Sequence, residues 1–448
     1  MLGPAQAFGI VVGGVIGASV FLVPSVVAQH VPSIGAIFLL WILGAAITLA
    51  GVLTLAELAA MMPQAGGGYV YINAAFGPLI GFLFSWTDAL LVRAGAAATI
   101  SYTFALYFVR LFGVPGSIAP QTWQGLVAII LVLLLLALNY RGASWGANVQ
   151  VAGTAAKLAA VGAAVILPLL LWRGPNGLTS APLWPAGPVA GGLVAALVPV
   201  LWTYGGWDQL AHLAEEVKDP SRNLPRILTA GMLTVAACYL AVVFGIHYVL
   251  PLKTVASSEV VGATLFEALL GAAGVTVISV VILVSALVSA NGAILSGPRA
   301  CFALARQGDA PAWLAKTHPR FETPSNAILL VGLWSASLIA VSLVLLRLSP
   351  SQQRPLFEVL ISYVMFGYLF FQGLIALSAI VLRREHPELD RPFRVPLHPL
   401  LPVASVASTV LLMGALAWNS PVEAAASAVI VGAGIPVALL FRRSLPVR

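Results

Sequence analysis

Long apolar runs recur along the whole chain, and they limit the folds it can adopt more than any other feature. A helix needs about 20 consecutive apolar residues to cross the hydrocarbon core of a bilayer. Charged residues make up 8% of the sequence, against about 25% in soluble domains. The sequence therefore predicts an all-α polytopic membrane protein with twelve transmembrane helices, at 5–28, 34–59, 78–110, 122–139, 146–172, 189–216, 225–250, 264–299, 326–347, 357–382, 398–418 and 421–441.

The segment 60–77 separates the second and third runs, and it is too polar and too rich in glycine to span. We expect a loop or a short surface helix there. Lysine and arginine are spread unevenly over the other connections. With the N-terminus inside, fifteen lie in inner loops and five in outer loops, while Arg93 and Lys157 lie within runs. Because basic loops stay in the cytoplasm, we expect both termini inside, in a multi-pass protein of the plasma (inner) membrane.

The sixth run contains a break in its helical pattern. An apolar helix is expected up to Trp202, the pattern is lost over 203–207, and a more polar helix resumes at Asp208 and stops before Pro220. Each of the two adjacent glycines costs roughly 1 kcal/mol in a helix interior. A broken helix at membrane depth is tolerated where it lines a cavity or is buried in protein. A pair of glycines also suits close packing of two helices, so this stretch alone leaves both interpretations open.

The first run carries a second cluster of small residues at its centre. Gly9, Gly13 and Gly17 have the small-xxx-small spacing of a packing face. However, runs one and six hold equivalent positions in a chain of two inverted five-helix repeats. We place these repeats at about 5–172 and 189–382 of a single transporter domain covering 1–448, with two extra helices at about 398–441. Glycine-interrupted segments at equivalent positions of two repeats point to the binding site of a secondary transporter, and the two breaks together favour a site.

Several motifs then resemble one family. GGVIGASVF at 13–21 resembles the G-x-x-I-G-x-G-I-F signature of the amino acid–polyamine–organocation (APC) superfamily, and WTYGGWDQLAHLAEEVKDPSRNLPR at 202–226 resembles its sixth-helix signature. LLVRAGAAATISYTFALY at 90–107 and TAAKL at 154–158 most resemble L-type amino acid transporters. NGAILSGPRACFALARQG at 291–308 resembles both L-type and cationic amino acid transporters. The resemblance implies the five-plus-five inverted-repeat fold with discontinuous helices 1 and 6.

The resemblance also implies how an amino acid would bind. The substrate carboxylate would meet backbone N–H groups at the first break, and the ammonium would meet backbone carbonyls at both breaks. General chemistry agrees, since N–H groups at a helix start bind anions and freed carbonyls bind cations. Ser19 stands where the family usually has glycine, so its hydroxymethyl group either narrows the carboxylate pocket or adds a donor. The predicted substrate-binding residues are Ile16, Gly17, Ala18, Ser19, Trp202, Thr203, Tyr204, Gly205, Gly206 and Asn291.

Three residues are candidates for coupling and gating. Trp202 matches an aromatic gate of the family, although it could equally be a packing tryptophan. Lys157 lies centrally in the fifth run, where a lysine is a functional candidate by default; the alternative is a lysine that extends to the surface. By resemblance, Lys157 occupies the sodium position of sodium-coupled relatives, either as a fixed charge, which we favour, or as a proton carrier. Asp208 would bind a cationic substrate, sense protons or cap the second half-helix.

The remaining charged residues are interpreted structurally. Asp88 precedes Arg93 by five residues, a spacing that does not put two side chains squarely on one face of an α-helix. Arg93 is therefore read as a structural residue. Glu215 and Glu216 close the sixth run beside Lys218, and they form either a cytoplasmic charge cluster that latches the inward gate or a solvated helix end.

Other classes of protein lack their motifs here. The six histidines show no i, i+3 or i+4 pair for a metal, and Gly66–Gly68 is not followed by the GK[ST] of a phosphate loop. We expect no metal, no cofactor, no nucleic-acid partner and no enzymatic activity. Cys238 and Cys301 lie in or at the end of apolar runs, so we predict no disulfide framework and no obligatory protein partner.

The sequence thus predicts a sodium-independent secondary transporter of small, neutral L-amino acids, working as an exchanger. The alternatives are a proton-coupled symporter and an antiporter of cationic amino acids or polyamines. A channel is the rival from another class, and its flux would not saturate with substrate.

Overall fold

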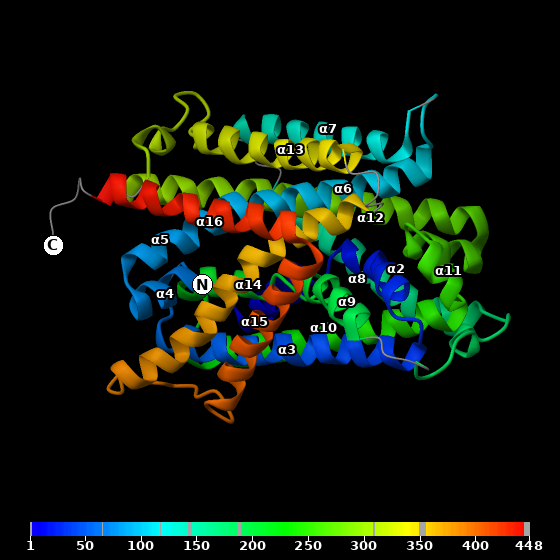
Figure 1. The fold of residues 1–448 in the computed structure, drawn as a ribbon, viewed down its shortest axis with the longest axis horizontal. Coiled ribbons are helices and arrows are strands. Elements are labelled where there is room, and N and C mark those ends of the chain that lie inside the picture. The colour runs from blue at the N-terminus through cyan, green and yellow to red at the C-terminus, as the bar shows by residue number, and fades with distance from the viewer. Residues whose placement is uncertain are drawn as a thin grey trace. The chain divides into compact units, whose positions relative to one another are not determined.

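The computed structural model describes residues 2–64, 66–116, 118–141, 146–185, 190–307, 310–348 and 355–442 (Figure 1). The regular elements in these ranges are all helical, which confirms the predicted all-α class. Within the same ranges, nine helices are long and apolar enough to cross a membrane. They are α3 (Ile34–Met61), the continuous helix Pro78–Phe112, α7 (Pro120–Tyr140), α10 (Pro220–Val249), α12 (Val261–Gln307), α13 (Ser325–Leu348), α14 (Leu356–Glu385), α15 (Leu400–Asn419) and α16 (Pro421–Arg442).

Of the other three predicted runs, the first and the sixth are interrupted, and the fifth is one helix. The first run forms α1 (Pro4–Val15), the 3-10 helix η1 (Ala18–Phe21) and α2 (Val23–His30). The fifth run forms α8 (Gly146–Leu171), and the sixth forms α9 (Ala190–Thr203) followed by η4 (Trp207–Glu216). The second half of the sixth run is thus a 3-10 helix and not the regular polar helix expected from its sequence. Leu213 inside η4 departs from helical dihedrals (φ −109°, ψ 18°), so this segment is not evenly wound.

Two other boundaries differ in detail from the sequence interpretation. The polar segment 60–77 contains a short helix, α4 (Gly68–Phe76), which was one of its two expected forms. The predicted run 264–299 is wrong at its start, because Gly271 has φ 65° and ψ −151° and interrupts α12. A Cβ atom on Gly274 would collide with the carbonyl oxygen of Phe266, so the chain folds back tightly at this point. Hydropathy cannot detect such a reversal because both arms are apolar.

The chain folds into two compact units. The first comprises Met1–Ala75, Thr154–Ile282 and Gln372–Ala415, and the second comprises Phe76–Gly153, Leu283–Phe371 and Leu416–Arg448. The chain passes from one unit to the other within α4 (Gly68–Phe76), α8, α12, α14 and α15. Each of the two predicted repeats contributes segments to both units, and the repeats themselves stay a prediction.

Close helix packing organises the first unit. α3 and α10 pack side by side (Figure 1). α3 also meets α9 where a Cβ atom on Gly44 would lie 2.6 Å from Val200 Cγ1. α1 meets α10 where a Cβ atom on Gly231 would lie 2.7 Å from Val11 Cγ1. Small residues at such crossings let helix backbones approach closely, which brings the interrupted helices α1 and α9 against continuous ones.

In the second unit α7 packs against α6 (Ala94–Phe112) and α13. Tyr102 of α6 donates its hydroxyl hydrogen to Gln124 Oε1 of α7 (2.7 Å). A Cβ atom on Gly332 of α13 would collide with Leu136 of α7. The three helices α6, α7 and α13 pack on one another, and α7 carries Asn139, a residue considered below.

Candidate substrate-binding site

The first break exposes backbone donors. Ile16 ends α1, its N–H still donating to Val12 (2.9 Å), and Gly17 is extended at φ −122° and ψ −177°. η1 then starts at Ala18. Hydrogen bonds of a 3-10 helix run from residue i+3 to residue i, so the N–H groups of Ala18 and Ser19 have no acceptor within η1. Helix starts of this kind are suited to anions, as the sequence predicted for a carboxylate.

The second break is sharper. The N–H of Gly205 donates to Trp202 (3.0 Å), and Gly206 adopts a left-handed conformation with φ 102° before η4 begins. Only glycine adopts that region without strain. Thr203 Oγ1 donates to the carbonyl of Pro199 (2.9 Å), so its hydroxyl is used within its own helix. What this break can offer a ligand is therefore mainly its backbone.

The two breaks lie against each other in the first unit. A Cβ atom on Gly206 would lie 2.9 Å from the carbonyl oxygen of Gly14, and one on Gly14 would lie 3.3 Å from Gln209 Oε1. Gly206 cannot gain a side chain without displacing the backbone of Gly14, whereas at Gly14 only the end of the Gln209 side chain would have to shift. The glycines that interrupt the two runs thus let the backbone of the second break approach the end of α1 closely.

Tyr239 of α10 joins the two breaks, and the sequence interpretation missed it. Its hydroxyl lies 2.8 Å from the carbonyl oxygen of Val15 and 3.1 Å from that of Thr203, so its one hydrogen serves the ends of α1 and α9. The ring packs against Tyr204 (5.2 Å between centroids) and Trp41 (6.0 Å). The signal was a tyrosine inside an apolar run, since a buried tyrosine hydroxyl usually has a partner, but no motif says which partner.

The side chains predicted at the second break differ in their surroundings. Trp202 is half-buried. Tyr204 is fully buried, and its hydroxyl donates to the carbonyl of Trp41 (3.3 Å), so its side chain packs against α3. The expectation that Asp208 caps η4 is wrong, because Gly206 is the N-cap residue. Asp208 lies in the first turn, where the positive end of the helix dipole favours a carboxylate.

Lys157 is buried on α8, with 6% of its surface exposed. This burial does not fit a lysine that extends to the membrane surface, because such a lysine keeps its ammonium in water. α8 packs tightly on α10, since a Cβ atom on Gly245 would collide with the carbonyl oxygen of Ala164. The role of Lys157 stays a prediction.

Asn291 belongs to the part of α12 in the second unit. Asn139 Nδ2 donates to the carbonyl of Leu135 (2.8 Å) and to Asn291 Oδ1 (2.7 Å). A backbone carbonyl only accepts hydrogen bonds, so Asn139 must direct its amide nitrogen toward Leu135 and Asn291. Asn291 must then accept the second hydrogen bond with its side-chain oxygen. Asn139 thus fixes the orientation of the Asn291 amide, while binding by Asn291 stays a prediction.

Asp88 and Arg93 do share one face, which the spacing on an α-helix did not predict, and Arg93 reaches a carboxylate, as its structural interpretation allowed. The segment Asp88–Arg93 is a π-helix, η2. Its i to i+5 hydrogen bonds bring residues five apart onto one face, and Arg93 Nε lies 3.2 Å from Asp88 Oδ2. The indole N–H of Trp334 donates to the carbonyl of Leu90 within the same segment (2.7 Å). Asp88 is thus an ion-pair partner of Arg93.

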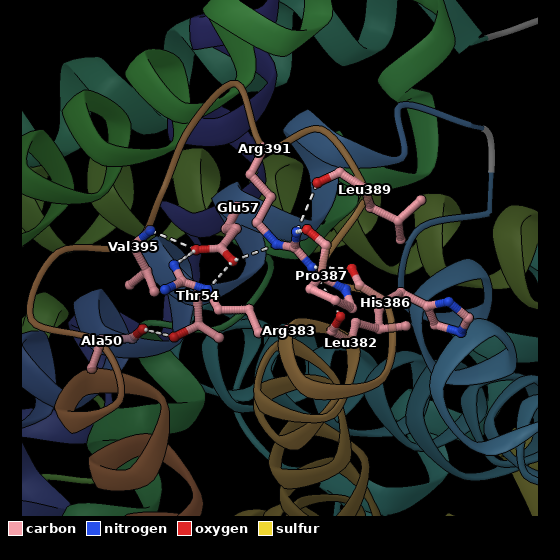
Figure 2. A network of polar contacts seen from close by, with 10 residues as sticks. All are labelled: Ala50, Thr54, Glu57, Leu382, Arg383, His386, Pro387, Leu389, Arg391 and Val395. Carbon is pink, nitrogen blue, oxygen red and sulfur yellow. Dashed lines mark hydrogen bonds and ion pairs between the residues drawn. The ribbon is translucent and has the colours of Figure 1, made fainter.

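A second polar network, also missed from the sequence, lies at the end of α3. Figure 2 shows Arg383, Arg391 and Val395 directed toward Glu57, whose side chain is 1% exposed. Arg383 Nε donates to Glu57 Oε1 (2.7 Å), Arg383 Nη2 donates to Oε2, and the N–H of Val395 donates to Oε2 (2.6 Å). Arg391 donates to four backbone carbonyls, those of Leu382, His386, Pro387 and Leu389. This network fastens the loop between α14 and α15 to α3.

Comparison with known proteins agrees with this architecture. Residues 2–441 match the model of the amino acid permease family. The chain is 30% identical over 439 residues to the serine/threonine exchanger of Bacillus subtilis (strain 168), covering 97% of this chain and 95% of the relative. It is 32% identical over 451 residues to the large neutral amino acids transporter small subunit 2 of Mus musculus (98% and 80% covered). It is 29% identical over 453 residues to the mouse Asc-type amino acid transporter 1 (99% and 82% covered).

These matches extend over almost the whole chain and include both breaks and all nine long helices. The family and the relatives are transporters and not enzymes. The protein belongs to the amino acid permease family of the APC superfamily, and it is a multi-pass membrane protein that transports amino acids.

Proposed function

We propose that the protein exchanges small, neutral L-amino acids by alternating access, without sodium. The observation that carries this proposal is the meeting of the two helix breaks, where Gly206 touches Gly14 and the Tyr239 hydroxyl reaches Val15 and Thr203. One relative is named an exchanger of serine and threonine, and another is named a transporter of large neutral amino acids. Both names agree on neutral substrates, and the exchanger of serine and threonine, which are small, is the relative covered over 95% of its length; exchange of small neutral substrates is the activity we favour.

Backbone groups replace the water around both charges of the amino acid. The carboxylate accepts hydrogen bonds from the N–H groups of Gly17, Ala18 and Ser19. The ammonium donates to the carbonyls of Ile16, Trp202, Thr203 and Gly205, among which Thr203 already accepts from Tyr239. A carbonyl has two lone pairs and can accept twice. α9 also ends here, and the negative end of its dipole favours a cation.

The substrate side chain is then selected by the surroundings of the breaks. The hydroxymethyl group of Ser19 takes up space beside the carboxylate donors, which favours small substrates. Trp202, half-buried just before the break, closes over the bound molecule as a gate. Asn291 lines the path with an amide whose oxygen is held by Asn139.

Lys157, which is buried on α8, supplies a positive charge in place of sodium. A proton-coupled symporter would instead need Lys157 or Asp208 to release a proton in each cycle. We place both termini in the cytoplasm of the plasma (inner) membrane, and we expect no obligatory protein partner. The two free cysteines belong to α10 and α12 and not to an outer loop, where a disulfide to a second subunit would form.

The test is uptake of labelled alanine into proteoliposomes at equal pH on both sides. Strong uptake only into vesicles preloaded with unlabelled serine, unchanged when potassium replaces sodium, is the expected result. Uptake into empty vesicles that an inward proton gradient accelerates would mean symport. Competition by lysine or spermidine but not by serine would favour the cationic alternative. A flux that does not saturate with alanine would mean a channel.

A further inference from the structure

The loop between α12 and α13 packs against the end of α7 through three rings. The ring of His318 stacks on that of Phe321 (4.6 Å between centroids) and meets the ring of Tyr140 edge-on (5.4 Å). His318 Nδ1 accepts hydrogen bonds from the N–H groups of Arg320 (3.2 Å) and Phe321 (3.3 Å). Thr323 Oγ1 donates to the carbonyl of Tyr140, the last residue of α7 (2.9 Å). We call Tyr140, His318 and Phe321 the aromatic cluster.

Backbone hydrogen bonds hold the same loop in one conformation. The N–H of His318 donates to the carbonyl of Thr323 (2.8 Å), and the N–H of Glu322 donates to that of His318 (2.9 Å). Asn326 Nδ2, at the start of α13, donates to the carbonyl of Trp313 (2.8 Å). Side chains on this loop are therefore presented from a fixed backbone, so little backbone entropy is lost when they bind a partner.

Three basic residues lie next to the aromatic cluster in the chain, and all three are exposed. Arg141 directly follows Tyr140, while Lys316 and Arg320 lie two residues to either side of His318. Among the residues that the structure describes, no acidic side chain forms an ion pair with any of the three. Their positive charges are therefore available to an anionic partner from outside the protein.

The surroundings of these charges suit the surface of a membrane. The guanidinium carbon of Arg320 lies 5.6 Å from the centre of the Phe321 ring, a contact that orients a cation without neutralising it. The loop joins α12 to α13, two helices long and apolar enough to span, so it lies at a membrane surface. Trp313 of this loop is 45% exposed, and tryptophan is enriched at the level of the lipid headgroups.

We propose that Arg141, Lys316 and Arg320 bind the headgroup of an anionic phospholipid, with Trp313 beside it at headgroup level. The two guanidinium groups offer paired N–H donors that suit phosphate oxygens, and the lysine adds a point charge. Phosphatidylglycerol has a net negative charge, whereas phosphatidylcholine carries a quaternary ammonium that the three cations repel. The site therefore prefers phosphatidylglycerol. This binding is separate from the exchange of amino acids and does not depend on it.

The test is a titration of the detergent-solubilised protein with dioleoyl phosphatidylglycerol, read from the melting temperature, because a ligand that binds the folded state stabilises it. The site variant combines Arg141→Gln, Lys316→Gln and Arg320→Gln. The control removes three exposed arginines of the first unit: Arg222→Gln, Arg226→Gln and Arg384→Gln. Each basic side chain near an anionic surface contributes a factor of about five. The half-saturating lipid concentration should therefore rise about a hundredfold in the site variant and stay within about threefold in the control.

Several results would overturn this site. One is equal binding of phosphatidylglycerol by the wild type and the site variant, and another is an equal loss in the control. Stabilisation by phosphatidylcholine as strong as that by phosphatidylglycerol would remove the selection by charge. Inorganic phosphate at the same concentrations should have no effect, and stabilisation by it as strong as that by the lipid would mean a site for soluble phosphate.

A single substitution repeats the test with the least change to the protein, and it decides the question if the triple variant does not fold. Lys316→Gln should raise the half-saturating lipid concentration about fivefold, and an unchanged value would contradict the proposal. Because binding is read from melting and not from transport, failure of the protein to exchange amino acids would count against the proposed function alone.

Discussion

The hydroxyl of Tyr239 touches the ends of α1 and α9 at once, and its ring packs against Trp41 and Tyr204. Tyr239→Phe keeps the ring and removes the one hydroxyl hydrogen that the two carbonyls share, an interaction worth about 1 kcal/mol. We expect exchange to fall about tenfold while the melting temperature changes little. Tyr248→Phe on the same helix is the control, because that ring stacks on Phe244. A rate equal to wild type for Tyr239→Phe would mean that the bridge is dispensable.

The role of Lys157 is tested by removing its charge at nearly constant length. Lys157→Met should lower exchange at least about tenfold, because a fixed ammonium in the membrane interior has no substitute there, while the protein still folds. Lys253→Met is the matched control, since Lys253 is exposed on α11 (Leu252–Ser257). The measurements are proteoliposome exchange and elution of a monodisperse protein. Normal turnover of Lys157→Met would end the assignment of Lys157 to coupling.

Among single residues, the sequence identified those that break an apolar helical pattern. It missed those that act by contacting a distant segment of the chain. Gly206 and Lys157 stand out because glycine breaks helices and lysine is rare at membrane depth. Tyr239 and Glu57 do not stand out in the same way, because their meaning depends on partners far along the chain. Tyr239 meets Val15 across 224 residues, and Glu57 meets Val395 across 338. Such pairings are set by tertiary packing and leave no local signal in one sequence.

Among the elements, the two breaks differ in how much room they leave for a side chain. Gly206→Ala would be strained by its φ of 102° and by the Gly14 carbonyl 2.9 Å away. Gly17→Ala has its nearest neighbours 3.8 Å away and no conformational conflict. We expect Gly206→Ala to lower both exchange and melting temperature, and Gly17→Ala to lower exchange alone by crowding the carboxylate. Equal melting temperatures for the two variants would mean that the second break tolerates rearrangement.

The Glu57 network holds the loop between α14 and α15, called the strap below, against the end of α3. Glu57→Gln places an amide against two guanidinium groups, and loss of one partner from a buried ion pair costs about 3–5 kcal/mol. We expect a clearly lower melting temperature and faster proteolysis between Pro387 and Val395. Glu385→Gln, exposed at the end of α14, should leave both unchanged. An unaltered protease pattern in Glu57→Gln would show that other contacts hold the strap.

The elements also show where sequence periodicity fails. The existence and extent of the long helices follow from apolar length alone, so α10, α13 and α14 begin and end within a few residues of their predicted runs. Helix type does not follow, because nothing in the residue patterns of Asp88–Arg93 and Trp207–Glu216 distinguishes a π-helix or a 3-10 helix from an α-helix. In an α-helix the side chains of Asp88 and Arg93 would not lie squarely on one face, whereas the π-helix brings them together as an ion pair.

For the molecule as a whole, hydropathy and loop charge predict a topology. Lys253 and Arg384 are both exposed, and the chain between them contains α12, α13 and most of α14. The residues 261–270 before the reversal at Gly271 reach only about 15 Å as a helix, too short to span a bilayer core of about 30 Å. We therefore expect the connection to cross the membrane three times, with Lys253 and Arg384 on opposite sides.

Labelling of single cysteines checks this topology. In the background with Cys238→Ser and Cys301→Ser, a membrane-impermeant maleimide should label Lys253→Cys in intact cells and Arg384→Cys only after permeabilisation. The inner position of Arg384 follows from the excess of basic residues in loops on that side. Labelling of both from outside would mean that 261–270 also crosses, while labelling in the reverse order would invert the whole chain.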